Sequence, residues 1–418
     1  MTTISHSQTI NAPLSGITTI AHPKNKPIHI KLGNSFSVTG SNQYFVIGSN
    51  NVTIEGSKCA TVVVSYTGGV PYLGLVQNGT SGVRAYDCLT VKHIKITNDV
   101  TNAVPLAAYA GWIGQRYFGR NAKDVVIKEC TNNGPISNDD CGGIVGADST
   151  CMVSECVNNS PVATEYSGGI VGAYADGTHA YKCKNTATAL VSSIDTGGVF
   201  GAYAVGCSAK RCRNEAVVSG IGAGGIFGGA GSELNQNKAC ECKNSGAVTG
   251  KDAGGIFGAS QDTSSAYKCY NTGALTAGVG EYVGGIFGNS SDRCTAEACF
   301  NNSNMTGAAG GIFAGAINST ARNCYNFGSL GTLGFGIISN DLGANLIDEC
   351  YVASAAITGL NPIHPAGVVS TIVTKYVSGV SEATGEWRDR SANKYLCGTD
   401  GTVWIRRCRN EPYKLNLC

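Results

Sequence analysis

Short runs in which apolar and polar residues alternate recur along much of the chain. The runs Ile28–Leu32, Asn51–Gly56 and Leu89–Ile96 place isoleucine, leucine or valine largely at every second position. A period of two is typical of a β-strand with one buried face. Glycine punctuates the runs and no helical period appears, so the pattern predicts an all-β protein built from many short strands.

A five-residue phrase built on a glycine pair recurs at a regular interval. Gly-Gly-Ile-Phe-Gly, or a variant of it, begins at Gly142, Gly168, Gly197, Gly224, Gly254, Gly284 and Gly310. A weaker copy begins at Ala110, and degenerate copies begin at Phe335 and Ala366. From Gly224 onward the steps between glycine pairs are 30, 30 and 26 residues.

A second phrase, Cys-x-Asn, keeps the same interval. Its cysteines are Cys130, Cys156, Cys183, Cys212, Cys242, Cys269, Cys299 and Cys324, while Cys350 is followed by Val352 instead of asparagine. Two phrases with one period indicate an internal repeat. A unit of about 25–32 residues with three short strands cannot bury its apolar face alone, but it can when stacked on its neighbours. The repeat therefore predicts a three-sided parallel β-helix with one unit per coil, right-handed by the rule for parallel crossovers.

The fixed residues of the repeat have expected roles. A recurring glycine suits a tight corner that needs a positive φ. A recurring asparagine tolerates such a corner too, and stacked amide side chains can hydrogen-bond from coil to coil.

Three segments are expected. Residues 1–40 lack the repeat and contain Pro13, Pro23 and Pro27, so we expect an N-terminal cap over the open end of the first coil. Residues 41–375 form the β-helix. Residues 376–418, where charged and aromatic residues concentrate after Pro365, form a C-terminal cap.

The composition disfavours several classes of function. Glycine makes up 58 of 418 residues and charged residues 14%, below the usual ~25%, as suits a solenoid with many tight corners. The net charge of +2 favours neither nucleic acid nor an anionic membrane. No apolar run approaches the ~18 residues of a membrane span. The start, Met1–Ser7, lacks the basic and apolar parts of a secretory signal, so we expect none.

The 19 cysteines allow three interpretations. The odd count and the missing signal disfavour a disulfide framework. Zinc is disfavoured because no Cys-x2-Cys occurs and Cys240-x-Cys242 has no matching pair. We therefore expect a ladder of reduced, buried thiols, one per coil, and no metal or other cofactor.

Gly-Gly-Ile-Phe-Gly followed by the Cys-Tyr-Asn-Thr-Gly phrase at Cys269 to Gly273 resembles the GLUG repeat family, over roughly residues 110 to 370. The plainer early coils resemble pectate-lyase-like β-helices. Such repeats occur in large bacterial surface adhesins, and cysteine-and-asparagine versions without signal peptides resemble predicted proteins of giant DNA viruses. The segment Trp404–Leu415 is similar to the end of those viral chains, whereas the adhesins' secretion apparatus is not visible.

An enzyme on such a scaffold would need carboxylates clustered on neighbouring coils. Asp139 and Asp140 are the best candidates, together with the residues just before each ladder cysteine: Glu129, Glu155, Lys182, Arg211, Glu241 and Lys268. Because signs vary along that row, a solvated face with ion pairs between coils is the simpler interpretation. The six histidines share no register, and no Ser-His-Asp arrangement or phosphate loop stands out. We expect no catalytic site.

These observations and the resemblance predict a non-enzymatic structural protein of a virus particle. It would be a minor capsid or surface-associated component of a large DNA virus, assembled in the host cytoplasm, with other virion or capsid proteins as partners. One alternative is an adhesin or glycan-binding β-helix, trimeric like a tailspike. Another is a polysaccharide lyase or hydrolase acting through Asp139 or Asp140 on acidic polysaccharides.

The residue between cysteine and asparagine should point outward if those two point inward. That row reads Thr131, Val157, Lys184, Arg213, Lys243, Tyr270, Phe300, Tyr325 and Tyr351. Its last four members predict an aromatic stripe that contacts a partner protein or a sugar. The alternative is an aromatic ladder that only stabilises the stack of coils.

Overall fold

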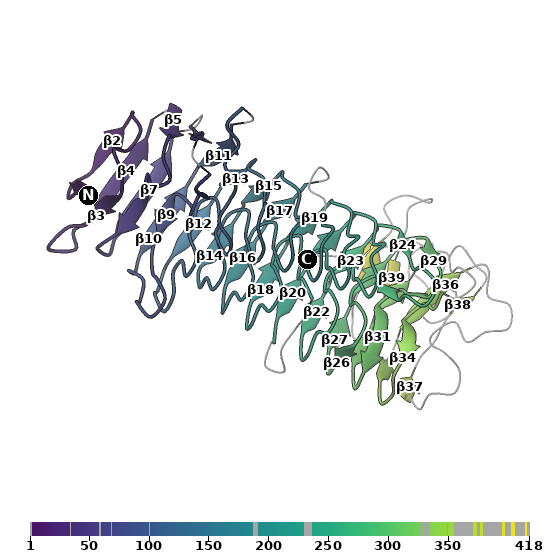
Figure 1. Cartoon of the computed structure of the whole chain (residues 1–418). Coiled ribbons are helices and arrows are strands. Elements are labelled where there is room, and N and C mark those ends of the chain that lie inside the picture. Colours follow the sequence, from purple (N-terminus) through teal and green to yellow (C-terminus); the bar gives the residue numbers. More distant parts are fainter. Residues whose placement is uncertain are drawn as a thin grey trace.

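The structure is a computed structural model. It describes residues 2–350 except 34, 58–59, 68, 100, 187–190, 230–235, 327, 329–333 and 349, and beyond them the backbone of 351–354, 371–373, 377–378, 395–397, 403–405 and 414–415. Every regular element among these residues is a β-strand. Figure 1 shows the strands following one another in sequence order along an elongated solenoid.

Two long parallel sheets form two sides of the solenoid. The first sheet runs in the order β2 (Gln8–Ile10), β4 (Ile28–Leu32), β7 (Val52–Gly56), β10 (Leu89–Lys92), β12 (Val126–Lys128), β14 (Met152–Ser154), β16 (His179–Tyr181), β18 (Ser208–Lys210), β20 (Lys238–Cys240), β22 (Ser265–Tyr267), β27 (Thr295–Glu297), β32 (Thr320–Arg322), β35 (Leu346–Asp348), β37 (Thr371–Val373). The second runs β5 (Ser35–Val38), β8 (Thr61–Val64), β11 (Lys95–Asn98), β13 (Thr131–Asn132), β15 (Val157–Asn158), β17 (Lys184–Asn185), β19 (Arg213–Asn214), β21 (Lys243–Asn244), β23 (Tyr270–Asn271), β28 (Phe300–Asn301), β33 (Tyr325–Asn326), β36 (Tyr351–Ser354), β38 (Val377–Ser378).

The third side of the solenoid contains fewer strands. It starts with β1 (Thr2–Ile4), β3 (Thr18–Ile20), β6 (Phe45–Ile47) and β9 (Val76–Gln77) and ends with β26 (Ser291–Asp292), β31 (Phe313–Ile317) and β34 (Ile338–Asp341). Between them the glycine-pair phrases meet through single parallel bridges, such as Val145 with Val171 and Phe200 with Phe227. Short pairs β24 (Leu275–Thr276) with β29 (Met305–Thr306) and β25 (Val283–Gly284) with β30 (Ala309–Gly310) add to the later coils. The prediction of an all-β parallel solenoid is confirmed.

The coils begin inside the segment that the sequence set apart as an N-terminal cap. β1 pairs in parallel with β3, and β2 with β4, at the same registers that the later coils continue. The boundary expected near residue 40 therefore does not separate the solenoid from something else, because even the plain Ile28–Leu32 alternation supplies a regular strand. That these first coils protect the open end stays a prediction. At the other end, β38 still pairs in parallel with β36, whereas β39 (Tyr395–Cys397), β40 (Val403–Ile405) and β41 (Lys414–Leu415) pair antiparallel. The rest of the expected C-terminal cap, residues 376–418, lies outside the described residues.

The buried asparagines form one continuous ladder, as the sequence predicted. Each Nδ2 donates to Oδ1 of the next asparagine at 2.7–2.9 Å, from Asn132 through Asn158, Asn185, Asn214, Asn244, Asn271 and Asn301 to Asn326. All eight are fully buried. The ladder joins the coils through side chains in addition to the backbone of the sheets.

The reason for the glycine pairs differs from the prediction. Each glycine of the seven pairs is described, and none has a positive φ. A Cβ on Gly198 would instead overlap the carbonyl of Gly225 in the next coil and lie 2.7 Å from Asn214 Oδ1. Close approach of the glycine-pair backbone to the next coil and to the asparagine ladder thus explains why the two phrases share one period. The left-handed corners are occupied by other residues, including Asp140, Tyr166 and Glu155.

The core is filled by matched ladders. Ladder cysteines from Cys130 to Cys350 are buried, and the described cysteines are free thiols. Burial raises the pKa of the Cys151, Cys207 and Cys294 thiols to about 12, which makes them unreactive. On the third side five rings stack with centroids 4.7–4.9 Å apart, namely Phe200, Phe227, Phe257, Phe287 and Phe313.

Residue sizes on opposite sides of the core compensate one another. Where the first sheet places Ile127 and Val153 inside, the third side of the same coil has Val145 and Val171. Where the third side carries its phenylalanines, the first sheet has only alanine, at Ala180, Ala209, Ala239, Ala266 and Ala296. Close packing requires a nearly constant volume per coil, and this exchange provides it.

Candidate functional site

Two of the four residues of the aromatic stripe expected on the second sheet are buried. Side chains alternate as predicted, since Cys269 and Asn271 are buried on either side of the partly exposed Tyr270. Phe300 and Tyr325, however, are only 4% and 2% exposed, and their rings stack at 5.5 Å. The side chain of Tyr351 lies outside the described residues.

Stacking covers ring faces that the alternation argument had left open to a partner. For Phe300 and Tyr325, the interpretation as a stabilising aromatic ladder therefore describes the structure better than a docking stripe. Lys243 is the last basic residue of the row and Tyr270 is its first aromatic residue. The Lys243 ammonium lies over the Tyr270 ring at 5.4 Å.

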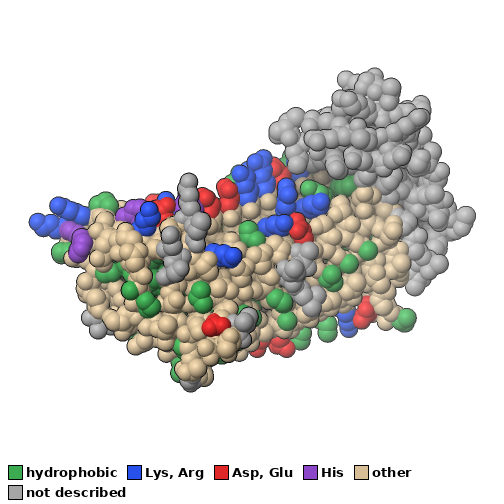
Figure 2. Space-filling view, turned by 90° about the horizontal axis from the view of Figure 1, so that it is seen from above, with side chains coloured by type: hydrophobic (Ala, Val, Ile, Leu, Met, Phe, Trp, Pro, Cys, Tyr) green, Lys and Arg blue, Asp and Glu red, His purple; other side chains and the backbone are tan. Residues whose placement is uncertain are grey.

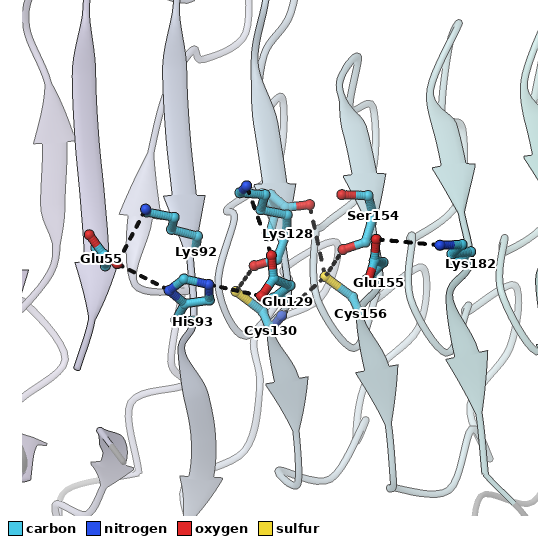
Figure 3. Close-up of polar contacts among 11 residues, drawn as sticks. Glu55, Lys92, His93, Lys128, Glu129, Cys130, Ser154, Glu155, Cys156 and Lys182 are labelled. Atoms are coloured by element: carbon cyan, nitrogen blue, oxygen red, sulfur yellow. Dashed lines mark hydrogen bonds and ion pairs between the residues drawn. The ribbon is translucent and has the colours of Figure 1, made fainter. Parts of the chain in front are cut away.

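The charged column before the ladder cysteines forms ion pairs between coils. His93 lies between Glu55 and Glu129, at 3.1 and 2.9 Å, and Figure 3 shows this arrangement beside the Glu155–Lys182 pair. Farther along, Arg211 pairs with Glu241 at 2.6 Å. Burial opposes ionisation of Glu55, yet hydrogen bonds from Lys92 and His93 hold its pKa below its ordinary value.

The signs in this column vary instead of converging. Figure 2 shows the same intermixing, with basic and acidic side chains interspersed along the rod. The expected solvated face with ion pairs between coils is confirmed for these residues. Among the residues that the structure describes, no group of histidine, cysteine and carboxylate side chains is arranged to hold a metal ion. The same residues include no helix that could cross a membrane.

A different surface brings tyrosines and carboxylates together. We call it the tyrosine–carboxylate cluster; it comprises Tyr109, Asp139, Asp140, Glu165, Tyr166, Tyr174, Asp195 and Tyr203. Two adjacent corner columns position it, both made of residues with φ between 50° and 65°. The first column is Tyr109, Asp140, Tyr166 and Asp195, and the second contains Tyr117, Asp148, Tyr174 and Tyr203.

Backbone hydrogen bonds hold the two columns side by side. The residues before three members of the second column donate their N–H groups to the carbonyls of first-column residues: Ala147 to Tyr109, Ala173 to Asp140 and Ala202 to Tyr166, at 2.9–3.1 Å. Tyr174 therefore lies next to Asp140, and Tyr203 lies next to Tyr166. The coil period thus repeats a pair of outward side chains on successive coils.

The tyrosine rings pack against one another on the outside of the rod. Tyr174 and Tyr203 stack with centroids 5.0 Å apart and planes 3° apart, and Tyr166 contacts Tyr203 at 5.6 Å. Tyr174 remains 40% exposed. Tyr174 and Tyr203 thus cover one ring face of each other, and the Tyr166 ring is tilted by 48° against Tyr203.

Two carboxyl groups in the cluster are poorly solvated. Asp140 is 6% exposed, and its Oδ1 is buried with no hydrogen-bond partner. Burial and the charge of Asp139 raise the pKa of Asp140, with Arg116 and Tyr109 opposing. Burial and the charge of Glu165 raise the pKa of Asp195 to about 6. Both groups are therefore weaker acids than an exposed aspartic acid.

Arg116 borders the cluster. Its Nε donates to Asp148 Oδ2 at 2.6 Å, and its guanidinium lies over the rings of Tyr109 and Tyr117 at 3.9 and 4.7 Å. Arg116 also lines an open pocket of about 280 Å³, together with residues that include Leu73, Gln77, Thr80 and Tyr117. The positive charge of Arg116 is thus already paired, and the cluster keeps an excess of carboxylates.

The sequence indicated part of this cluster. Asp139 and Asp140 were its candidate carboxylates, and the structure places both there, with Asp139 Oδ1 accepting a hydrogen bond from the Glu165 N–H at 2.9 Å. Asp195 and the tyrosines were missed. A signal did exist: these residues stand two positions before or six positions after the first glycine of a pair, as Tyr166 and Tyr174 do around Gly168.

Comparisons with known proteins do not identify a family for this chain. No model of a known protein family matches the sequence, and no curated protein matches it. Among solved structures, the ORF18 protein of Geobacillus virus E2 aligns at 10% identity and a TM-score of 0.28, covering 95% of this chain and 61% of that one. Tailspike protein 3 of bacteriophage CBA120 aligns at 11% identity and a TM-score of 0.24, covering 93% and 64%. The chain spans less than two thirds of either, and likeness at this level carries no argument about function.

Proposed function

We propose that the chain is a non-enzymatic structural rod of a virus particle, a minor capsid or surface-associated component of a large DNA virus. The observation that carries the proposal is the continuity of the ladders. Asparagines bond from Asn132 to Asn326, and phenylalanines stack from Phe200 to Phe313 without interruption. Bending the rod would break these contacts at every coil, so the molecule is suited to spanning a fixed distance. The viral setting rests on the resemblance of the Cys-x-Asn repeat.

The pairing of charges supports a non-enzymatic role. The column from His93 to Glu241 satisfies its charges between coils, as a structural surface does. In this proposal the partners are other virion or capsid proteins or further copies of the chain, a trimer included. The protein would reside in the virion after assembly in the host cytoplasm.

Mass spectrometry of gradient-purified particles tests the proposal. We expect peptides of the chain to co-purify with the major capsid protein at constant ratio across the particle peak. An abundant non-structural protein from the same infected cells serves as the control and should be lost during purification. A chain that is abundant in the lysate but leaves the particle peak with that control would rule out a virion role.

The second candidate is the glycan-binding or adhesin function, and the tyrosine–carboxylate cluster favours it. Tyr174, which is 40% exposed beside the carboxylates of the cluster, is chemically suited to contact a polar ligand with apolar faces. The same carboxyl groups, with their raised pKa, would serve a hydrolase or lyase if one were present.

A further inference from the structure

The corner where the first sheet meets the second is basic over four successive coils. Residues 179–186, 208–215, 238–245 and 265–272 contain eight lysine or arginine residues and two glutamates. In the flanking coils, residues 152–159 and 295–302 add two more glutamates and no basic residue. Figure 2 shows lysine and arginine side chains gathered midway along the rod, where these coils lie. We call the eight residues the basic corner: Lys182, Lys184, Lys210, Arg211, Arg213, Lys238, Lys243 and Lys268.

The parallel register lines up three of these cations on the second sheet. Lys184 pairs with Arg213, and Arg213 pairs with Lys243. Neighbouring strands lie about 4.8 Å apart, and like charges placed directly opposite one another destabilise a sheet. A salt bridge from Lys184 to Glu215 at 2.9 Å offsets part of this repulsion. An anionic ligand lying along the row would offset more of it.

Cations also lie on the first-sheet side of the corner. Lys210 on β18 and Lys238 on β20 are exposed there. Between the two sheets, Arg211 pairs with Glu241 at 2.6 Å, and Lys182 lies 3.9 Å from a glutamate of the preceding coil. The corner column thus balances most of its own charge, so the excess of positive charge lies on both sides of it.

Tyrosine rings hold three of the ammonium groups in place. The three pairs are Lys182 over Tyr181 at 5.1 Å, Lys243 over Tyr270 at 5.4 Å and Lys268 over Tyr267 at 5.1 Å. One face of each ring is therefore occupied by a cation of the protein itself. Single-stranded nucleic acids are held by bases stacked on open aromatic faces as well as by phosphate contacts. The arrangement here favours a ligand that is recognised by its charges alone.

We propose that the basic corner binds a sulfated polysaccharide that runs along the rod. Cations outnumber carboxylates two to one over these coils and their flanks, which selects a polyanion. A polyuronate carries one charge on each sugar. A heavily sulfated chain carries charges on several sides of its sugars, so it can meet the cations on both sides of the corner at once. The proposal uses no residue of the tyrosine–carboxylate cluster and does not require the chain to be part of a virion.

Biolayer interferometry with immobilised heparin tests the proposal. Polygalacturonate, an oligothymidylate and dextran provide the carboxylated, nucleic-acid and neutral comparisons. We expect heparin to bind most tightly, and added salt to weaken its binding. Lys210→Gln with Arg213→Gln removes one exposed cation from each side of the corner and should weaken heparin binding about tenfold. Lys210→Arg with Arg213→Lys keeps both charges and should retain the binding.

The matched control is Lys31→Gln with Lys95→Gln, which removes the same charge from the same two sheets outside the basic corner. Both lysines are exposed, and Lys95 occupies the column of Lys184 but pairs with Thr61 and Thr131. This control should bind heparin as the unchanged protein does, and thermal melting verifies that each variant is folded. The proposal is overturned if heparin does not bind, or if any of the three comparison polymers binds as tightly. An equal loss of heparin binding in the control would overturn it too.

Discussion

Left-handed residues other than glycine form columns at the corners of this solenoid. One column precedes the ladder cysteines, as at Glu155, and two others carry residues of the tyrosine–carboxylate cluster, as at Tyr166 and Tyr174. Such a conformation costs a non-glycine residue about 1–2 kcal/mol. The backbone N–H of each corner residue bonds to the next coil, for example Glu155 to Tyr181 at 2.8 Å, which offsets that strain. Corner side chains are thereby aimed outward, and this is how the tyrosine–carboxylate cluster comes to lie on the surface.

Asp195 shows how such a corner can be destabilised by its own charge. Its carboxyl packs against Gly222 and Gly229 of the next coil, where a Cβ on either glycine would overlap Oδ1. Its pKa rises from an ordinary 3.8 to about 6, so the native state holds a proton that the unfolded chain has lost between these pH values. Stability should therefore fall as pH rises through this window.

We predict that Asp195→Asn stabilises the protein at pH ~7.5 and has little effect at pH ~4. Because Asp195 is partly exposed, solvent screening reduces the expected gain in unfolding free energy to about 1 kcal/mol. Urea denaturation at the two pH values measures it. Asp252→Asn is the matched control, since Asp252 occupies the equivalent corner but accepts a hydrogen bond from Asn289 at 2.9 Å. An equal effect of Asp195→Asn at both pH values would contradict the charge argument.

At the scale of elements, the side-chain ladders connect the regular coils more continuously than their short strands do. The second-sheet strands of the regular coils are two residues long, as in β21 (Lys243–Asn244), and the third side is held there by single bridges. The asparagine ladder runs across these short elements. Its hydrogen bonds all point the same way, because each Nδ2 donates to the asparagine of the next coil toward the C-terminal end. Asn326 is the last member, and its Nδ2 is buried without a partner since Val352 occupies the next position.

This polarity predicts unequal effects along the ladder. In Asn244→Ala, bonds to Asn214, Asn271 and the carbonyl of Gly246 are lost, at 2.8, 2.7 and 2.7 Å, and buried groups are left unsatisfied. We expect a loss of about 3 kcal/mol in unfolding free energy. Asn326→Ala breaks the single ladder bond from Asn301 and should cost about 1 kcal/mol. Urea denaturation of both variants tests the order, and equal losses would show that the ladder does not act through its hydrogen bonds.

At the scale of the whole molecule, the repeat period was enough to predict the parallel solenoid. Two phrases in step identify one coil each, and the alternation of cysteine and asparagine gives the inward face. The period does not predict which residues of different coils contact one another. The glycines were assigned to positive φ because their approach to Gly225 and Asn214 of other coils is invisible in a linear pattern. Phe300 and Tyr325 were expected to be exposed because alternation says which way a side chain points but not what covers it.

The candidate site was predictable only in part, for a related reason. Asp139 and Asp140 are adjacent in sequence and stand out, whereas Tyr166, Tyr174 and Tyr203 are separated by stretches of chain and come together through two corner columns. Each of these residues lies at a fixed offset from a glycine pair. That offset identifies them as neighbours in space only when the corner geometry is known. Position relative to the repeat is therefore a better guide to sites on this rod than motifs of neighbouring residues.

Because each coil contacts mainly the coils beside it, one whole coil should be removable. Deleting residues 240–266 joins Ala239 to Tyr267, which occupies the place of Cys240 in the register of the first sheet. The new neighbours are then of the same kind in every ladder: Cys212 with Cys269, Asn214 with Asn271, and Phe227 with Phe287. We expect this shortened chain to fold, with a strand-type circular dichroism spectrum and a melting temperature within about 5 °C of the full chain. The matched control is deletion of residues 240–253, which removes half a coil and sets the ladders out of register, so it should melt without cooperativity or be degraded in limited proteolysis. If both deletions unfold the protein equally, its stability depends on contacts beyond adjacent coils, and the picture of a rod built by independent addition of coils is wrong.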